Sequence, residues 1–285
     1  MKTGLILEGG AMRGLFTAGV IDVMLEQDIA VDGMIGVSAG AAFGCNFKSK
    51  QAGRVLRYNK RFCKDKRFCS FYSLLKTGDL YGADFCYREI PETLDPFDKD
   101  TFANDPTEFY LVCTDIESGK AVYKQLKKSD GNAMDWFRAS ASMPLVSTPV
   151  EIGKQKLLDG GIVDSIPVRY FESIGYEHNI IVLTQPTGYQ KKKNALLSLM
   201  RIALRKYPNV ALAMVRRHEI YNETLAYIGQ LEQQGKALVI RPPVKLEVGH
   251  VEHDAERLQQ AYDMGRAEAL RRINEIKNFI KSGQD

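Results

Sequence analysis

The chain has 285 residues, of which 45% are hydrophobic and 26% are charged, and its formal net charge is +4. This composition is typical of a globular protein whose core is large enough to need no disulfide bonds. It argues against a nucleic-acid binder, because no long basic block alternates with aromatic residues. The longest uncharged run, residues 33–47, is shorter than a membrane-spanning helix requires.

The start of the chain and the cysteine pattern both indicate a cytoplasmic protein. The first ten residues do not form a signal peptide, because their apolar stretch is short and is interrupted by an acid and glycines. The cysteines are odd in number and show no CxxC spacing, so we expect reduced thiols and no zinc site. They are Cys45, Cys63, Cys69, Cys86 and Cys113.

Apolar segments alternate with helical patterns along the chain. Residues 3–8 predict a buried strand, residues 13–27 a helix and residues 34–37 a second strand, after which a helix of small residues begins at Ser38. A long amphipathic helix is expected over residues 254–281. Further strands are expected at residues 108–116, 120–125, 154–159, 179–185 and 237–242. This alternation predicts an α/β fold with a mostly parallel sheet that helices cover on both faces.

A serine between two glycines follows the second predicted strand. Residues 36–40 read Gly-Val-Ser-Ala-Gly, which fits the G-x-S-x-G pattern of a nucleophile elbow. In that turn the glycines leave room for a sharp change from strand to helix, and the serine hydroxyl projects at a helix N-terminus, which favours developing negative charge. An N-capping serine between glycines gives the same letters. The strand–turn–helix context favours a nucleophile at Ser38.

Four histidines are candidates for a Ser-His-Asp triad. His218 lies in a helical pattern, His250 and His253 lie in a polar segment before the last helix, and His178 precedes a strand. None of them has an acidic partner placed to orient it. Only one strand clearly precedes Ser38, whereas the elbow of an α/β-hydrolase follows several strands. A triad is therefore not the favoured interpretation.

A glycine-rich loop follows the first predicted strand. Residues 8–14 lack the G-K-[ST] ending of a P-loop, and the third position counted from Gly9 is Ala11 instead of the glycine of a dinucleotide-binding loop. A tight strand–helix turn is one interpretation. An oxyanion hole is the favoured one, because glycines let backbone N–H groups turn towards an anion and the next helix adds its positive end.

A third motif ends the strand predicted at residues 154–159. Residues 156–161 read Lys-Leu-Leu-Asp-Gly-Gly, which places the Asp159 carboxylate at a strand end, as Ser38 is placed. On its own an Asp-Gly pair is a common turn. Asp115 also ends a strand, and we interpret it as a structural turn acid.

These three motifs, in this order, resemble those of the patatin-like phospholipase family, which has a G-G-x-x-R-G loop, then G-x-S-x-G, then D-G-G or D-G-A. Residues 138–150 resemble the family's A-S-x-x-x-P segment, residues 164–168 resemble the stretch after its D-G-G, and residues 263–273 resemble the end of its bacterial members. The motif core runs from about residue 3 to residue 186. Residues 187–285 are expected to add helices and one strand to the same single domain.

The resemblance implies a three-layer α/β/α fold and a catalytic Ser–Asp dyad without histidine. By position, Ser38 is the expected nucleophile and Asp159 the expected base, and the expected oxyanion-hole amides are those of Gly9, Gly10 and Ala11. In this chemistry Asp159 takes the Ser38 proton and returns it to the leaving alcohol. Because a carboxylate is a weak base at its ordinary pKa, we expect burial to raise the pKa of Asp159.

Two further residues of the glycine-rich loop bear on substrate binding. The resemblance implies that Arg13 lies beside the oxyanion hole, near a substrate phosphate. Family members usually have a third glycine where this chain has Ala11. Alanine keeps its N–H donor, but its methyl group costs about 1–2 kcal/mol if the position needs a positive φ.

Two segments combine apolar and basic residues. Residues 194–217 fit a helical pair that meets anionic lipid or a helix packed on the core with solvated arginines, and the pattern favours the second. Residues 59–68 fit a solvated helix face or loop, with electrostatic steering of lipid headgroups as the alternative. Peripheral membrane contact therefore stays open, and membrane insertion is not supported.

The favoured function is a lipid acyl hydrolase that acts on phospholipid, lysophospholipid or another acyl ester through an acyl-enzyme. Two alternatives stay open, namely a non-catalytic patatin-like adaptor that binds lipid or protein, and a thioesterase or small-ester esterase with the same dyad. The sequence has no metal-ligand cluster and no EF-hand pattern. We therefore expect activity that needs no cofactor or metal and is independent of calcium.

Overall fold

The computed structural model describes residues 1–127, 132–193 and 204–283, and a sheet of eight strands forms its framework. The strand order is β5-β6-β3-β2-β1-β7-β8, and β4 pairs with β3 as well. The strands are β1 (Thr3–Leu7), β2 (Gly33–Val37), β3 (Glu108–Asp115), β4 (Ala121–Leu126), β5 (Val150–Ile152), β6 (Gln155–Asp159), β7 (His178–Val182) and β8 (Ala237–Ile240).

The sheet is parallel in its main part and antiparallel at one side. Strands β3, β2, β1, β7 and β8 pair in parallel, as the alternation of strands and helices predicts. Strands β4 and β6 pair with β3 in antiparallel fashion, and β5 pairs with β6 in the same way. Short turns join β3 to β4 and β5 to β6, and a turn of a few residues can join antiparallel neighbours but cannot cross over to a parallel one. Strand β5 was not expected from the sequence.

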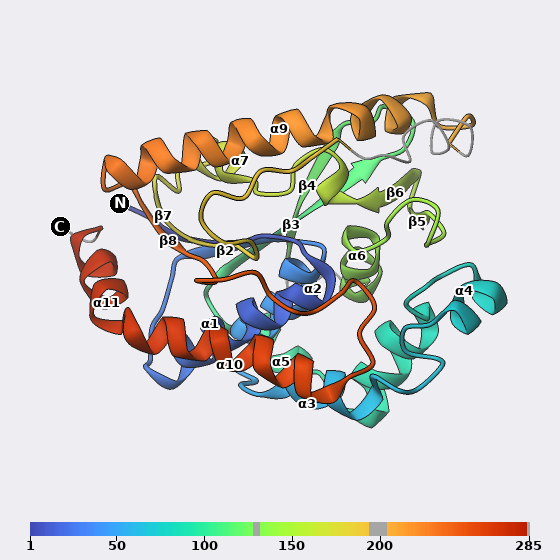
Figure 1. The fold of residues 1–285 in the computed structure, drawn as a ribbon, viewed down its shortest axis with the longest axis horizontal. Coiled ribbons are helices and arrows are strands. Elements are labelled where there is room, and N and C mark those ends of the chain that lie inside the picture. The colour runs from blue at the N-terminus through green and yellow to red at the C-terminus, as the bar shows by residue number, and fades with distance from the viewer. Residues whose placement is uncertain (128–131, 194–203, 284–285) are drawn as a thin grey trace.

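Helices cover both faces of the sheet and complete three layers (Figure 1). One face carries α1 (Gly14–Glu26), α2 (Ala39–Lys48), α3 (Arg54–Phe62), α5 (Lys99–Asn104), α6 (Ala133–Ser140), α10 (Ala255–Arg271) and α11 (Ile273–Ser282). The other carries α7 (Val168–Ser173) and α9 (Pro208–Gln233). Helix α4 (Phe71–Thr77) and the π-helix η2 (Phe85–Leu94) lie at one edge, and the short 3₁₀-helices η1 (Ala11–Arg13) and η3 (Gly160–Ile162) follow β1 and β6.

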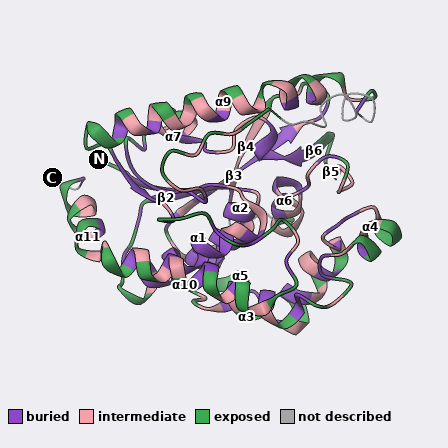
Figure 2. Ribbon diagram, viewed as in Figure 1, coloured by how far each residue is buried: buried purple, intermediate pink, exposed green. Residues whose placement is uncertain are grey.

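Alternating side chains of the central strands feed two separate cores. Leu5 and Leu7 of β1 belong to the core beneath α1 and α2, whereas Ile6 belongs to the core beneath α7 and α9. This follows from the strand period of two residues, which sends successive side chains to opposite faces. Figure 2 shows the strands buried between helices that expose only their outer sides. The three-layer α/β/α fold expected from the sequence is confirmed.

Two glycines let the C-terminal helix α10 pack closely on α1. A Cβ atom on Gly19 would lie 2.1 Å from the Tyr262 carbonyl oxygen, and one on Gly265 would lie 2.0 Å from the Phe16 carbonyl oxygen. Both distances are far below van der Waals contact, so neither position accepts a larger residue without moving the helices apart. Gly265 belongs to the segment 263–273 that resembles bacterial family members, and this contact gives it a structural role.

The single long helix expected over residues 254–281 is wrong, because the chain forms two helices, α10 and α11, with a break at Arg272. Arg272 has φ −105° and ψ 12°, outside the helical region. Its guanidinium donates to the Val239 carbonyl oxygen of β8 and pairs with Glu275 at 2.6 Å. No glycine or proline marks this break, so its cause is a contact with the sheet.

Candidate active site

Ser38 lies at the sharp turn between β2 and α2. Its backbone has φ 55° and ψ −122°, a left-handed conformation that a non-glycine residue adopts only when its surroundings impose it. The flanking glycines allow the turn, because a Cβ atom on Gly36 would lie 2.5 Å from the Gly40 carbonyl oxygen and one on Gly40 would lie 2.3 Å from that of Leu7. The G-x-S-x-G pattern thus produces the strained strand–turn–helix geometry typical of a nucleophile elbow.

Strand register brings Asp159 to Ser38. Strand β2 runs parallel to β3 and ends with Val37 opposite Val112. Strand β6 runs antiparallel to β3 and ends with Asp159 opposite Cys113, the next residue along. Because β4 occupies the other edge of β3 over the same stretch, β2 and β6 share one edge and meet end to end. Ser38, which directly follows β2, therefore faces the residue that ends β6.

The Asp159 carboxyl is buried, with a 1% exposed fraction, and it is held in place by backbone contacts. Its Oδ1 accepts the Gly161 N–H at 2.7 Å, and its carbonyl oxygen accepts the Thr114 hydroxyl at 2.8 Å. Burial raises the pKa of Asp159, while a hydrogen bond with the Ser38 side chain, the Gly161 N–H and the charge of Arg217 act in the opposite direction. A raised pKa makes this carboxylate a better general base than a solvated one.

The end of α6 and the segment after it position both of these residues through hydroxyl and carbonyl groups. Ser140 Oγ accepts the Ser38 N–H at 3.0 Å and donates to the Val112 carbonyl oxygen at 2.7 Å. The Ser142 carbonyl oxygen accepts the Asp159 N–H at 2.7 Å. Both serines lie in the segment 138–150 that resembles the A-S-x-x-x-P motif, so the motif points to this region, but the sequence gives no sign of either contact.

The glycine-rich loop lies directly against the serine turn. A Cβ atom on Gly9 would lie 3.0 Å from the Ser38 Cβ, and one on Gly10 would lie 2.8 Å from the Thr184 hydroxyl. Neither glycine has a positive φ, so the backbone conformation does not require glycine at these positions. Glycine is needed there because a side chain would be too close to its neighbours. Among the described residues, no hydrogen bond uses the amide N–H of Gly9, Gly10 or Ala11. Three donors beside Ser38 are thus available to an anion.

Ala11 has φ 49°, so the position does require the left-handed conformation that glycine usually provides. The steric cost of about 1–2 kcal/mol expected for a positive φ at this residue therefore applies. The rest of the loop is held by Glu8, whose carboxylate accepts the Thr184 N–H at 2.5 Å and the Tyr221 hydroxyl at 2.6 Å. The role of Glu8 was not expected from the sequence.

An apolar pocket opens beside Ser38 on the face of the sheet that carries α2. It encloses about 170 Å³, and its lining includes Ala11, Met12 and Ser38. Farther in, the walls are mostly aromatic or aliphatic, and they include Phe43, Tyr58, Phe68, Tyr87, Ile90, Phe97, Phe137 and Val146. A pocket of this composition suits a hydrocarbon chain.

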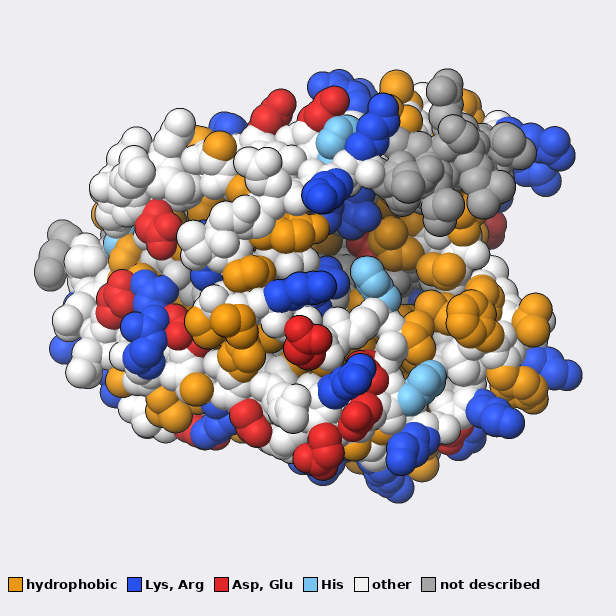
Figure 3. Space-filling model, in the orientation of Figure 1, with side chains coloured by type: hydrophobic (Ala, Val, Ile, Leu, Met, Phe, Trp, Pro, Cys, Tyr) orange, Lys and Arg blue, Asp and Glu red, His pale blue; other side chains and the backbone are white. Residues whose placement is uncertain are grey.

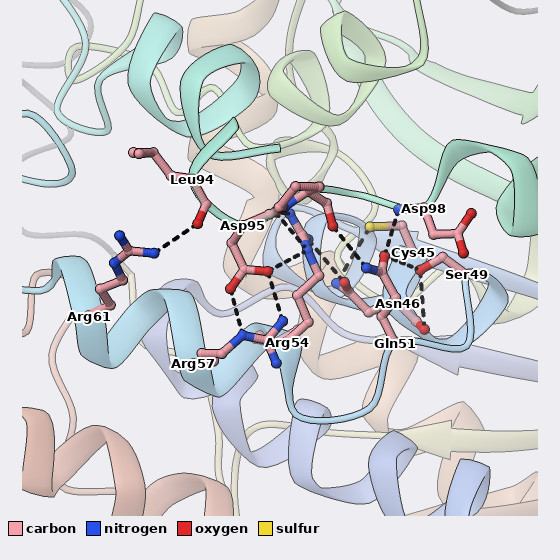
Figure 4. Close-up of polar contacts among 12 residues, drawn as sticks. Cys45, Asn46, Ser49, Gln51, Arg54, Arg57, Arg61, Leu94, Asp95 and Asp98 are labelled. Atoms are coloured by element: carbon pink, nitrogen blue, oxygen red, sulfur yellow. Dashed lines mark hydrogen bonds and ion pairs between the residues drawn. The ribbon is translucent and has the colours of Figure 1, made fainter. Parts of the chain in front are cut away.

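The charged side chain of Arg54 also lines this pocket, and its donors are already occupied. Its Nε and Nη2 atoms donate to the Asp95 carbonyl oxygen at 3.1 and 2.6 Å, and Nη1 donates to Asn46 Oδ1 at 3.0 Å (Figure 4). The Asp95 carboxylate also binds Arg57. This network fastens α3 to the segment around Asp95, so we assign Arg54 to the support of the pocket wall and not to an anionic ligand.

The four histidines do not complete a triad. The rings of His178, His218 and His253 each lie within hydrogen-bonding distance of a backbone carbonyl oxygen away from Ser38. His250 lines the same pocket as Ser38, but no hydrogen bond among the described residues joins its ring to Ser38 or to the carboxylate of Asp159. The Ser–Asp dyad stays a prediction from the family resemblance.

Asp115 serves the turn between β3 and β4. Its Oδ1 accepts the Ser118 N–H at 2.9 Å and the Ser118 hydroxyl at 2.7 Å. These bonds form an Asx turn, which is the structural role expected from the sequence.

The two apolar and basic segments differ in how far the structure describes them. Residues 194–203 lie outside the described residues. From residue 208 the segment belongs to α9, where Val210 and Met214 pack into a small core with Ile116 and Leu158. Residues 59–68 cover the end of α3 and the turn after it, where Arg67 pairs with Asp65 at 2.8 Å. Both segments thus have structural roles in the parts that are described.

Neither a metal cluster nor a membrane-spanning helix occurs among the described residues. Over residues 1–127, 132–193 and 204–283, no group of three or more His, Cys, Asp or Glu side chains is arranged to hold a metal ion. No helix in the same ranges is both long and apolar enough to cross a membrane.

Residues 5–172 match the family model described as patatin-like phospholipase. This match covers more than half of the chain and includes the glycine-rich loop, Ser38 and Asp159. The chain belongs to the patatin-like phospholipase family. Residues 207–281, which include α9, α10 and α11, match a second family model, described as a domain of unknown function (DUF6363).

Relatives of known name are similar at low identity. The uncharacterized protein YjjU of Escherichia coli is 26% identical over 93% of this chain and 75% of its own length. The lysophospholipase nte1 of Emericella nidulans is 25% identical over 96% of this chain, which spans only 18% of that protein. The lysophospholipase NTE1 of Saccharomyces cerevisiae is 30% identical over 60% of this chain and 10% of its own length. Among solved structures, VipD from Legionella pneumophila matches 96% of this chain and 67% of its own, with a TM-score of 0.49 and 10% identity.

Proposed function

We propose that the chain is a serine-dependent lipid acyl hydrolase in which Ser38 is the nucleophile and Asp159 the general base. One observation carries the proposal. A serine in a strained left-handed turn faces the buried carboxylate that ends β6, and it opens on an apolar pocket. Strain at a serine and a raised carboxyl pKa both have a cost in stability, and such features gather at catalytic sites.

The first half of the reaction forms an acyl-enzyme. The Asp159 carboxylate takes the Ser38 hydroxyl proton as Oγ bonds to the ester carbonyl carbon, and the carbonyl electron pair moves to its oxygen. In this proposal the N–H groups of Gly9, Gly10 and Ala11, which make no hydrogen bond among the described residues, stabilise that oxyanion. The intermediate then expels the leaving alcohol, which takes the proton from Asp159.

The second half releases the acid. Asp159 takes a proton from water as the water oxygen bonds to the acyl carbon, and the new oxyanion returns to the same N–H groups. Cleavage of the bond to Ser38 Oγ frees the carboxylic acid, and the serine oxygen regains its proton from Asp159. Each step balances without a metal or a cofactor.

The substrate class follows from the pocket and the family. The apolar pocket beside Ser38 is suited to the acyl chain of a lipid ester. The family and the lysophospholipases among the relatives support hydrolysis of phospholipid or lysophospholipid over that of a small ester. We propose a lysophospholipid or phospholipid as the substrate.

The test is active-site labelling by a fluorophosphonate probe, with the adduct mapped by mass spectrometry. We expect stoichiometric labelling of Ser38 in the wild type, none there in Ser38→Ala, and labelling slowed by at least about 100-fold in Asp159→Asn. Asp115→Asn is the matched control, because Asp115 also ends a strand but only closes a turn. It should label at the wild-type rate.

The outcomes separate the alternatives. Failure of the folded wild type to label would overturn the proposal and favour a non-catalytic adaptor. Labelling of Ser38 followed by turnover of thioesters or short esters only would favour the thioesterase or small-ester esterase. Equal rates for Asp159→Asn and Asp115→Asn would remove Asp159 from the mechanism.

A further inference from the structure

Three cationic side chains gather beside the candidate site, outside the apolar pocket. Arg13 lies in η1, Lys191 lies in the connection between β7 and α9, and Arg217 lies on α9. None of them lines the apolar pocket, whereas His250 lines it and has its pKa lowered by burial and by the charges of all three. The cations therefore lie near His250, and they are not among the residues that line the pocket. Figure 3 shows Lys and Arg side chains around a hollow below α9 on this face.

Helix α9 fixes Arg217 next to the expected base. Arg217 Nε donates to the Gly161 carbonyl oxygen at 2.5 Å, and the N–H of the same glycine donates to Asp159 Oδ1 at 2.7 Å. Gly161 thus links the Arg217 guanidinium to the Asp159 carboxylate through two hydrogen bonds. The other guanidinium donors of Arg217 are not used in any hydrogen bond within the described residues.

The same helix fixes Lys191 through Tyr221, one turn beyond Arg217. Lys191 Nζ lies 4.2 Å from the centre of the Tyr221 ring, and the Lys191 backbone exchanges hydrogen bonds of 2.8 and 3.0 Å with the Asn222 side chain. The Tyr221 hydroxyl in turn donates to Glu8, directly before the glycine-rich loop, at 2.6 Å. Lys191 is therefore held close to the loop that carries the candidate oxyanion donors.

These cations lack direct counter-charges. Within residues 1–127, 132–193 and 204–283, no carboxylate oxygen lies within 4.0 Å of a charged nitrogen of Arg13, Lys191 or Arg217, and Arg13 Nε is buried without a partner. The nearby carboxylates of Glu8 and Asp159 are bonded elsewhere. Burial, then the charges of Arg217 and Arg13, lower the pKa of Lys191 to about 8. Half-buried cations that repel one another are stabilised by an anion that binds between them.

We propose that Lys191 and Arg217, together with Arg13, form a binding site for the phosphate group of the substrate's leaving alcohol, beside Ser38 and outside the acyl pocket. This inference rests on the proposed hydrolase function. It assigns a role to α9, which lies in the part of the chain matched by the domain of unknown function. A phosphate ester has the charge and the acceptor oxygens to satisfy these donors.

The first arm of the test compares a lysophospholipid with a monoacylglycerol that carries the same acyl chain. Lys191→Met and Arg217→Met should each lower the ratio of the two kcat/KM values by at least about ten-fold, because each removes a charge-assisted contact with the phosphate. The matched controls are Lys192→Met and Arg216→Met, which remove the same charges from exposed neighbouring positions. They should leave the ratio within about two-fold of wild type.

The second arm needs no turnover, so it separates this inference from the proposed hydrolase activity. Calorimetry on Ser38→Ala protein measures binding of sn-glycerol 3-phosphate and of inorganic phosphate. We expect the glycerol ester to bind, and Lys191→Met in the same background to weaken it by at least about ten-fold. Equal affinity for inorganic phosphate together with an unchanged lipid ratio would mean a site for a free anion, which would overturn the inference. Absence of binding and of any ratio change would overturn it as well.

A second inference rests on a separate feature, the exposed apolar surface of α4. Phe71 and Leu75 are 74% and 88% exposed, and Tyr72 and Leu145 are also exposed. Lys76 is an exposed cation on the same helix. Figure 3 shows hydrophobic side chains with Lys and Arg around them at the edge where Figure 1 places α4. Large apolar side chains gathered in this way on a surface mark a binding face.

The neighbours of α4 connect this surface with the apolar pocket. Phe68 before the helix and Leu80 after it both line the pocket. The Leu80 carbonyl oxygen accepts the Ser70 N–H at 3.0 Å, and the Leu80 N–H donates at 2.8 Å to the carbonyl oxygen of Val146, which is also a lining residue. The Phe68 carbonyl oxygen accepts the Gly82 N–H at 3.1 Å. A lipid surface in contact with α4 would therefore lie next to the pocket wall.

We infer that α4 docks the protein on an anionic membrane surface, with Phe71 and Leu75 among the acyl chains and Lys76 at the headgroups. The combination of apolar and cationic side chains is that of an interfacial helix. The residues of this surface are not part of the segment 194–217, for which the sequence leaves lipid contact open.

Vesicle sedimentation tests the docking without any catalytic turnover. Wild type should bind phosphatidylcholine vesicles more tightly when they contain phosphatidylglycerol, and Phe71→Ser and Leu75→Ser should each lower the partition coefficient by at least about ten-fold. Leu270→Ser is the matched control, since Leu270 is 49% exposed on α10, outside both segments that combine apolar and basic residues. An equal loss in Leu270→Ser, no binding by wild type, or a change of oligomeric state in Phe71→Ser with no change in vesicle binding would each overturn the inference.

Discussion

Replacement of Ala11 by glycine tests whether the candidate oxyanion loop stores strain. Ala11 has φ 49°, which costs an L-residue about 1–2 kcal/mol, whereas glycine adopts it freely. The greater freedom of glycine in the unfolded chain offsets about 0.4–1 kcal/mol of that gain. We therefore expect Ala11→Gly to increase the free energy of unfolding by about 0.5–1 kcal/mol, which raises Tm by roughly 1–3 °C in a chain of this size.

The assay is urea unfolding followed by fluorescence, with calorimetry for Tm. Ala267→Gly is the control, because Ala267 is exposed within α10 and has no positive φ. The same chemical change there should decrease the free energy of unfolding by about 1 kcal/mol. The two variants are thus expected to shift stability in opposite directions. A destabilisation of Ala11→Gly equal to that of Ala267→Gly would refute the argument from backbone strain.

Three other predictions concern the site and the helix packing. Ser140→Ala removes the acceptor of the Ser38 N–H, so labelling of Ser38 by a fluorophosphonate should slow by about ten-fold. The same change leaves the buried Val112 carbonyl oxygen without its donor, so the free energy of unfolding should also fall by about 1–3 kcal/mol. An unchanged labelling rate would contradict the positioning role. Burial raises the pKa of Asp159, and the base must be ionised to act, so kcat/KM should rise with pH and the midpoint of this rise should lie above the pKa of an ordinary carboxyl group. A pH–rate profile on a neutral ester measures this midpoint. A midpoint at or below about pH 4 would contradict the prediction. Gly265→Ala should decrease the free energy of unfolding by at least about 2 kcal/mol, because the added Cβ would lie 2.0 Å from a carbonyl oxygen of α1. Gly229→Ala is the control in the same urea titration. A Cβ at Gly229 has no atom within 4 Å, so this variant should not be destabilised.

The parts of the fold that the sequence predicts are those that depend on short stretches of chain. The strands expected to begin at residues 3, 34, 108, 154 and 179 contain apolar residues bounded by glycine or polar residues, and each begins within one residue of its expected start. The strand–turn–helix at Ser38 follows from two glycines that lie two positions away on either side. The five-stranded parallel part of the sheet follows from the helices between its strands.

The features that the sequence does not predict depend on contacts between distant segments. The break at Arg272 results from a guanidinium that binds a carbonyl oxygen of β8 and has no local signal. The left-handed backbone at Ala11 is imposed by the loop around it, against the preference of alanine. Ser140 reaches the Ser38 amide across 102 positions of the chain. Periodicity and motif spacing report on local geometry only, so none of these contacts was accessible from them.

The meeting of Ser38 and Asp159 shows how the fold turns separate motifs into one site. Each motif alone only places a side chain at a strand end. The site exists because β6 runs antiparallel along the same edge of β3 that β2 occupies, so that the two strands end at consecutive residues of β3, Val112 and Cys113. A parallel β6 would carry its aspartate away from the serine. The antiparallel edge of the sheet, which departs from a fully parallel α/β design, is therefore the part of the topology on which the proposed dyad depends.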